Sequence, residues 1–316
     1  MKVLANDGID ALGKSLLEQA GFEVVTDKIE QSELINGISE FDVLIVRSAT
    51  KVNAEVISAA ENLKLIARAG VGLDNIDLKA AGEAQITVVN TPNASSRSVA
   101  ELVMAHAFSV SRMIHMTNRI MPTEGKERFK ELKKKASKGF ELTGKTIGII
   151  GFGRIGQEVA KMAIGLGMKV LVYDYKGRSF DLTIALHEQY CNHNFQVTLM
   201  GVSMEQVLSE SDIISVHTPG SAQVIGKEEL NTCKDGVVLV NCARGGVVNE
   251  NDLKNAIDSG KVAFAGIDVF ESEPPVNDTM LHLHNASLSP HIGASTAEAQ
   301  QRVGIELAEK IIQHLG

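Results

Sequence analysis

The chain is poor in the features that mark secreted, metal-binding and membrane proteins. Its three cysteines are an odd number without metal-ligand spacing, as is typical of a reduced cytoplasmic protein. No apolar run approaches the roughly 18 residues of a membrane span. Asp7 falls where the apolar core of a signal peptide would begin. We therefore expect a cytoplasmic protein with no bound metal and no membrane partner.

Positive charge is also in short supply. The 31 Lys and Arg residues against 39 Asp and Glu residues give a net charge of −8, whereas nucleic acids and anionic membranes attract positive surfaces. The basic run KERFKELKKKASK (126–138) has no aromatic ladder beside it. We interpret this run as a solvated helix face or arm and expect no nucleic-acid partner.

Short apolar segments alternate with helical patterns along the whole chain. The apolar segments lie at residues 2–6, 22–25, 42–48, 63–70, 86–90, 142–151, 169–174, 212–217, 236–241 and 262–270. This alternation predicts an α/β protein of two Rossmann-like or flavodoxin-like domains, each with a parallel sheet covered on both faces. A long helix over 96–116 would link the two domains.

The segment GIIGFGRIGQEVA places Gly151, Gly153 and Gly156 in G-x-G-x-x-G spacing. The motif follows an apolar strand and opens a helix, which is the context of a dinucleotide-binding loop. The next strand ends at Asp174, whose carboxylate suits the ribose hydroxyls of NAD and would repel the 2′-phosphate of NADP. Lys176 and Arg178 weaken that exclusion of NADP. The alternative is a glycine turn used only for packing.

Chemically useful side chains follow the later strands of the second domain. His217, Thr218 and Pro219 follow one strand, Arg244 the next, and Glu273 and His291 the last two. Ligands of parallel sheets bind beyond the carboxyl ends of the strands, so these residues should share one crevice. There His291 can accept a hydroxyl proton, Glu273 can orient His291, and Arg244 can hold a carboxylate. We interpret Glu271, His282 and His284, which lie between them, as solvated or structural.

Five segments together carry a resemblance to a known family. VRSATKV, GFGRIG, VNCARGGVV, DVFESEPP and SPHIGAST resemble the D-isomer-specific 2-hydroxyacid dehydrogenases from about residue 40 onwards, most weakly in 110–140 and 175–204. The resemblance implies Arg244, Glu273 and His291 as catalytic residues and NAD as the cofactor. It also implies that NAD is contacted by the glycine loop and by Arg154, Ile155, Asp174, His217, Thr218, Pro219, Cys242, Ala243, Arg244, Asp268, His291, Gly293 and Ala294.

The first domain carries a candidate phosphate site. Arg47 and Arg68 each end an apolar strand, and Lys51 lies one turn beyond Arg47. Two arginines and a lysine at one edge can hold a doubly charged phosphate, although ordinary surface salt bridges are the alternative. RSATKV resembles the phosphoglycerate dehydrogenases of the family, and backbone groups of Ala69, Gly70 and Val71 would hold the substrate carboxylate.

The resemblance thus implies oxidation of 3-phospho-D-glycerate in a cleft between a substrate domain, residues 1–93 plus 292–316, and an NAD-binding Rossmann domain, residues 94–291. It implies a homodimer that contacts itself through the helix 96–116 and the following arm. A glyoxylate or hydroxypyruvate reductase is an alternative, as is an NADH-sensing binding protein. The segment after HTP is short for the family and the stretch after Asp174 is long. We expect no serine inhibition, because no regulatory domain follows.

Overall fold

A computed structural model describes residues 1–175, 177, 179–186, 189, 193–276 and 278–316 of the chain. The internal contacts divide these residues into two compact units. Unit 1 comprises Met1–Ser98 and Ala294–Gly316, and unit 2 comprises Val99–Gly293. The two-domain α/β architecture expected from the sequence is confirmed. The boundaries expected at residues 93 and 292, with a role for each domain, stay a prediction.

Unit 1 is a parallel five-stranded sheet with helices on both faces. Its strand order is β2-β1-β3-β4-β5, with bounds Lys2–Ala5 (β1), Glu23–Val25 (β2), Val43–Val46 (β3), Leu65–Arg68 (β4) and Thr87–Asn90 (β5). Its helices are Ala11–Gln19 (α1), Leu34–Gly37 (α2), Ile38–Glu40 (η1, a 3₁₀ turn), Ala54–Ala59 (α3), Leu78–Glu83 (α4) and Ala297–Leu315 (α12).

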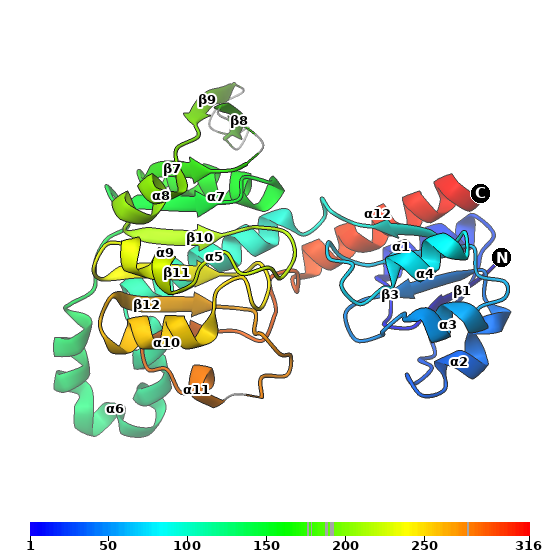
Figure 1. Ribbon diagram of the computed structural model, residues 1–316, viewed down its shortest axis with the longest axis horizontal. Helices are drawn as coiled ribbons and strands as arrows, with labels where there is room; N and C mark the ends of the chain where they lie inside the picture. The colour runs from blue at the N-terminus through cyan, green and yellow to red at the C-terminus, as the bar shows by residue number, and fades with distance from the viewer. Residues whose placement is uncertain (176, 178, 187–188, 190–192, 277) are drawn as a thin grey trace. The chain divides into compact units, whose positions relative to one another are not determined.

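The strand residues of unit 1 alternate between two cores, as the period of two of a β-strand requires. Val3 and Ala5 point to the face that α1 and α12 cover, whereas Leu4 points to the face covered by α2, α3 and α4. Both faces are therefore buried, which explains the continuously apolar strands in the sequence. The C-terminal helix α12 closes one of these faces, so the end of the chain belongs to unit 1 (Figure 1).

Unit 2 is a six-stranded parallel sheet in the order β13-β12-β11-β10-β6-β7. The strands are Thr146–Ile150 (β6), Lys169–Tyr173 (β7), Ile213–Val216 (β10), Val237–Asn241 (β11), Val262–Ile267 (β12) and Ala286–Leu288 (β13). From β6 the chain passes to β7 on one side, and later to β10 on the other. This switch point is where parallel sheets bind ligands.

Two helical layers bury the sheet of unit 2. One face packs against Ser96–Ser111 (α5) and Arg154–Gly165 (α7), and the other against Met204–Glu210 (α8), Lys227–Thr232 (α9) and Glu250–Asp258 (α10). The short helix Asp278–Leu281 (α11) precedes β13. The helices thus bury both faces of the sheet. Because all its strands are parallel, their carboxyl ends lie at one common edge, and the loops at this edge form the candidate site.

The fold differs from what the sequence led us to expect in two places. The single helix expected over 96–116 is wrong: α5 ends at Ser111, and a new helix, Ile114–Ala136 (α6), begins after Met113. Met113 has φ 54°, a left-handed conformation that an α-helix cannot accommodate. The basic run 126–138 largely forms the end of α6, as interpreted, and the dimer contact expected there stays a prediction.

The other difference is a β-hairpin in the long stretch after Asp174, which the sequence had not led us to expect. Ser179–Ala185 (β8) and Asn194–Met200 (β9) pair antiparallel, and Figure 1 shows them extending past β7, the edge strand of the sheet. Gly201 then bridges back to Val172 of β7. Lys176, Arg178 and Cys191 lie outside the described residues.

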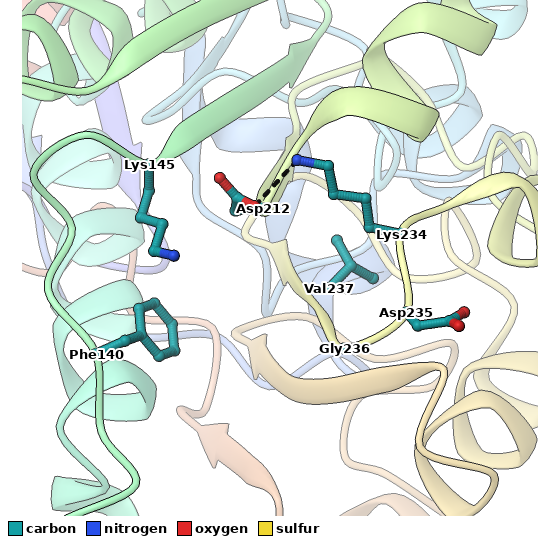
Figure 2. A pocket seen from close by; sticks show the side chains of 7 residues that line it. All are labelled: Phe140, Lys145, Asp212, Lys234, Asp235, Gly236 and Val237. Atoms are coloured by element: carbon teal, nitrogen blue, oxygen red, sulfur yellow. Dashed lines mark hydrogen bonds and ion pairs between the residues drawn. The ribbon is translucent and has the colours of Figure 1, made fainter.

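A shallow pocket of about 270 Å³ opens at the opposite edge of the sheet, at the amino ends of β6, β10 and β11. Figure 2 shows the side chains that line it, among them Lys145, Asp212, Lys234 and Asp235. The two lysines and two aspartates cancel in charge, and Lys234 pairs with Asp212 at 3.1 Å. Because it lies at the amino ends of the strands, this pocket is separate from the loops at the carboxyl edge.

Among the described residues no helix combines the length and apolarity of a membrane span.

Candidate functional site

The glycine loop runs from the end of β6 into α7. Gly151 has φ 92°, and a Cβ there would lie 2.7 Å from the carbonyl oxygen of His217. A Cβ on Gly156 would lie 2.4 Å from the carbonyl oxygen of Gly151, whereas one on Gly153 would meet no atom within 4 Å. The first and third glycines thus permit tight packing, and the second leaves open space at the helix start.

The amino end of α7 suits a phosphate group. Gly153 is the N-cap and has no side chain to bond the first amides of the helix. Arg154 and Ile155, the first two helical residues, carry amides that face outward from the helix end. Free N–H groups and the helix dipole together favour an anion at this place. The loop therefore fits the pyrophosphate of a dinucleotide.

Asp174 follows β7 directly and contacts the same loop. Its Oδ2 accepts a 2.7 Å hydrogen bond from the backbone N–H of Phe152. The carboxylate is thus held beside the glycine loop, at the distance along the chain where a ribose partner is expected. A negative charge here favours NAD over NADP.

Phe152 is a residue that our reading of the sequence missed. Its ring packs on Phe180 of β8, with ring centroids 4.8 Å apart at 59°. The hairpin therefore packs against Phe152, which lies between Gly151 and Gly153 of the glycine loop. The alternating apolar residues of 179–185 and 194–200 could have indicated the hairpin, but its contact with the glycine loop could not be read from spacing.

His217 and Thr218 follow β10, next to Gly151. Burial lowers the pKa of His217 to about 4, so its imidazole is neutral, and its Nε2 lies 2.8 Å from the Ser215 hydroxyl. His217 Nδ1 and Thr218 Oγ1 are buried and have no hydrogen-bond partner among the residues that the structure describes. Buried polar atoms are nearly always bonded. These two atoms therefore fit a polar ligand such as the cofactor, for which Pro219 would be the next contact.

The loop after β11 carries Arg244. Asn241 accepts a bond from the Ala243 N–H through its Oδ1 and donates one to the Arg244 carbonyl through its Nδ2, each at 3.0 Å. A Cβ on Gly245 would collide with the backbone carbonyl of Phe270. The loop therefore packs directly on the segment that leads to Glu273.

Cys242 begins the same loop. Burial and the nearby charge of Asp268 raise the pKa of its thiol well above the ordinary value. The thiol is therefore protonated and a poor nucleophile. Its expected role, lining the cofactor site, needs no reactivity.

Glu273 and His291 form the central contact of the site. Glu273 Oε2 lies 2.7 Å from His291 Nδ1, and the side chains are 38% and 42% exposed. His291 has φ 53°, an uncommon left-handed conformation for a residue other than glycine. With Nδ1 occupied by the carboxylate, Nε2 is the nitrogen left to exchange a proton with a ligand.

Two other candidates near this pair, Glu271 and His282, bond to groups away from it. Glu271 and Glu250 bond reciprocally, each carboxylate accepting the backbone N–H of the other residue, at 3.2 and 2.7 Å. His282 Nδ1 bonds the Asp278 carbonyl oxygen at 2.7 Å within α11. Glu271 is thus a link to α10 rather than only a solvated neighbour.

Asp268, expected to contact NAD, also anchors the loop that carries His291. Its Oδ1 accepts bonds from the Ser289 hydroxyl at 2.6 Å and the Ile292 N–H at 2.8 Å. Its Oδ2 accepts the Gly293 N–H at 3.0 Å, and its carbonyl oxygen accepts the His291 N–H at 2.8 Å. The carboxylate therefore holds the backbone after the histidine and the Ser289 side chain before it.

In unit 1, Arg47 follows β3, and Val46 pairs with Arg68 in the next strand. Asp7 accepts the Arg47 N–H at 2.7 Å and the Thr50 N–H at 3.1 Å. Asn75 donates to the carbonyl oxygens of Arg47 and Thr50, each at 2.7 Å. The loop that bears Arg47 and the exposed Lys51 is therefore held rigidly at the carboxyl edge of the sheet.

The substrate-carboxylate contacts expected at the backbone groups of Ala69, Gly70 and Val71 stay a prediction. The Ala69 amide donates to the Val46 carbonyl oxygen at 2.8 Å, as part of the strand pairing, and the Gly70 amide donates to the Arg68 carbonyl oxygen at 2.9 Å. Gly70 itself, with φ 146°, lies under the Arg68 guanidinium. The amides of Ala69 and Gly70 thus already have acceptors within the chain, and a substrate carboxylate would have to share or replace those bonds. Ala294, another expected contact, uses its carbonyl to hold Gln300.

The sequence and fold of the chain are similar to those of known proteins. The family model described as "D-isomer specific 2-hydroxyacid dehydrogenase, NAD binding domain" matches residues 104–293. A hydroxypyruvate reductase of Thermotoga maritima is 47% identical, covering 100% of this chain and 98% of its own length. A D-3-phosphoglycerate dehydrogenase of Archaeoglobus fulgidus is 42% identical over 99% of this chain, which spans 57% of that relative's length.

Among solved structures, the NAD-bound 3-phosphoglycerate dehydrogenase of Entamoeba histolytica superposes with a TM-score of 0.77 at 27% identity. The match covers 99% of this chain and 94% of that one.

Proposed function

The chain belongs to the D-isomer-specific 2-hydroxyacid dehydrogenase family, with NAD as its cofactor, and from that premise we propose that it oxidises 3-phospho-D-glycerate to 3-phosphohydroxypyruvate. This reaction would place it at the entry to serine synthesis. The observation that carries the acid–base chemistry is the 2.7 Å contact between Glu273 and His291.

In the proposed mechanism His291 Nε2 takes the proton of the C2 hydroxyl while that carbon loses a hydride. NAD held by the glycine loop and Asp174 would supply the hydride acceptor, so that the alcohol would become a ketone by loss of two electrons and two hydrogens. Glu273 stabilises the imidazolium that forms, because an opposite charge lies within hydrogen-bond distance. Arg244 holds the substrate carboxylate and polarises the adjacent oxygen. In the reverse direction the same groups return the proton.

The phosphate assignment rests on unit 1. Arg47 and Lys51 extend from a loop whose backbone Asp7 and Asn75 hold in place, and Arg68 ends the neighbouring strand. Guanidinium groups bind phosphate oxygens in pairs, and the ammonium of Lys51 adds a third positive charge. This cluster supports a phosphorylated substrate over a plain one.

A hydroxypyruvate reductase is the second candidate. It is supported by the 47% identity to the Thermotoga protein over nearly the full length of both chains. The two candidates share the reacting carbon and the acid–base pair, so only the phosphate contacts separate them.

The deciding experiment follows NADH absorbance with 3-phosphohydroxypyruvate, hydroxypyruvate and glyoxylate as substrates. We expect kcat/KM to be highest for the phosphorylated compound. Higher values for hydroxypyruvate would favour the second candidate. No turnover with any 2-keto acid, despite NADH binding, would favour an NADH-sensing protein.

Arg47→Ala tests the phosphate site itself. Loss of a charged hydrogen bond costs about 1.5–3 kcal/mol, so KM for 3-phosphohydroxypyruvate should rise by roughly 10- to 100-fold. The KM for hydroxypyruvate should change by less than about threefold. Lys79→Ala is the matched control, because Lys79 is an exposed cation of α4 in the same unit. An unchanged KM for the phosphorylated substrate in Arg47→Ala rules out this site.

A further inference from the structure

A buried histidine is linked by hydrogen bonds to the loop that carries His291. His106 of α5 is 4% exposed, and both of its ring nitrogens are bonded. Nδ1 lies 2.9 Å from the Ser287 hydroxyl in β13, and Nε2 lies 3.0 Å from the Ser289 hydroxyl. Burial lowers its pKa, so the ring is neutral and carries one proton.

The hydrogen bonds around His106 fix where that proton is. Ser289 donates its only hydroxyl proton to Asp268 Oδ1 at 2.6 Å, so it can only accept from His106. Nε2 of His106 must therefore carry the proton, which leaves Nδ1 as the acceptor nitrogen. Nδ1 faces the Ser287 hydroxyl, which also lies 3.3 Å from the Ser109 hydroxyl. The result is a directed chain, in which His106 donates to Ser289 and Ser289 donates to Asp268.

The far end of this chain is the loop that carries His291. Asp268 bonds the amides of Ile292 and Gly293 through its carboxylate and the amide of His291 through its carbonyl oxygen. His291 has a left-handed backbone that costs free energy for a non-glycine residue, so these bonds must hold it. A change at His106 therefore reaches His291 through only two intermediate side chains.

We propose that His106 is a positioning residue of the acid–base site, which acts through Ser289 and Asp268 to hold His291 in contact with Glu273. The inference rests on the proposed function, because the proton transfer at His291 is part of it. His106 itself would touch neither substrate nor cofactor.

Two substitutions of His106 separate positioning from packing. In His106→Gln the side-chain amide can reach the place of Nε2 and still donate to Ser289, whereas in His106→Asn it reaches only the place of Nδ1. We expect His106→Gln to keep kcat within about threefold, and His106→Asn to lose roughly tenfold in kcat with KM changed less than twofold. Equal losses in both variants would overturn the proposal.

Ser289→Ala removes the middle of the chain with a smaller change of volume. It should lower kcat as much as His106→Asn does, and the double variant should lose little more, because both break one chain. Additive losses would contradict a common chain. His115→Asn is the matched control, since His115 is also buried and its Nδ1 bonds the Ser109 carbonyl oxygen at 3.3 Å. It should keep the wild-type kcat.

Amide hydrogen exchange gives a readout that needs no turnover. In His106→Asn the amides of Ile292 and Gly293 should exchange about tenfold faster than in wild type, with those of β10 unchanged. Unchanged exchange at Ile292 and Gly293 would overturn the positioning role. If the wild type turns over no 2-keto acid, the proposed function fails, and exchange still decides whether His106 holds the loop.

Discussion

Replacing Glu273 with glutamine is the most direct perturbation of the acid–base pair. Glu273→Gln keeps the size of the side chain and an oxygen that can accept a bond, but it removes the negative charge 2.7 Å from His291 Nδ1. The charge matters most when the imidazole is protonated, which the proposed mechanism requires at the transition state. The substitution should therefore act on kcat rather than on substrate binding.

The size of the effect follows from the exposure of the pair. Two unit charges about 4 Å apart attract by about 1 kcal/mol in water and about 4 kcal/mol near a protein surface. With the two side chains 38% and 42% exposed, water screens the pair strongly. We therefore expect a loss of about 1–2 kcal/mol, or roughly 5- to 30-fold in kcat.

The assay follows NADH oxidation with the best 2-keto acid over a range of concentrations. Glu271→Gln is the matched control, because Glu271 lies in the same segment and bonds Glu250 rather than a histidine. It should keep kcat and KM within about twofold. A Glu273→Gln variant with wild-type kcat would refute the role of the charge. An equal loss in Glu271→Gln would show that the segment, and not the pair, is what the substitution disturbs.

Two further predictions concern the cofactor loops. The folded pKa of His217 is lowered to about 4 from an ordinary 6.5, so the unfolded chain binds the extra proton first and stability falls as pH drops from about 6.5 to 4, by up to roughly 3 kcal/mol. In urea unfolding, His217→Gln should lose less stability than wild type over that window, and parallel curves would contradict the burial argument. Phe180→Ala removes an aromatic pair with Phe152 worth about 0.5–1.5 kcal/mol. Calorimetry should show NAD binding weakened up to about tenfold, with Phe195→Ala at the exposed far end of the hairpin as the control; equal affinities in the two variants would reject the contact.

The sequence predicted the strands well because their burial on both faces leaves long apolar segments. Each strand of the two parallel sheets except the three-residue β13 coincides with one of the ten apolar segments of the sequence. The break at Met113 was not predictable in this way, since the apolar pattern of 96–116 continues across it. The hairpin was missed because a two-stranded ribbon at a sheet edge has one polar face and only short alternating segments.

The site was predictable only as far as strand ends allow. Topology brings the loops after β10, β11, β12 and β13 to one edge, so His217, Arg244 and His291 could be grouped from the sequence. The bonds within each loop could not, because they depend on backbone directions. The sequence could not show, for example, that the Ala69 amide pairs with the neighbouring strand and that the Gly70 amide bonds the Arg68 carbonyl oxygen.

The cofactor loop and the acid–base loop are held in opposite ways. At the glycine loop, function depends on missing side chains, since a Cβ on Gly151 or Gly156 would collide with a backbone carbonyl. At the acid–base loop it depends on side chains that are present, because His291 has a left-handed backbone without being a glycine. Such a conformation must be stabilised from outside the residue, and Asp268 bonds the amide of His291 and the two amides that follow it. Substitutions at the glycine loop should therefore weaken NAD binding, whereas those around Asp268 should lower kcat.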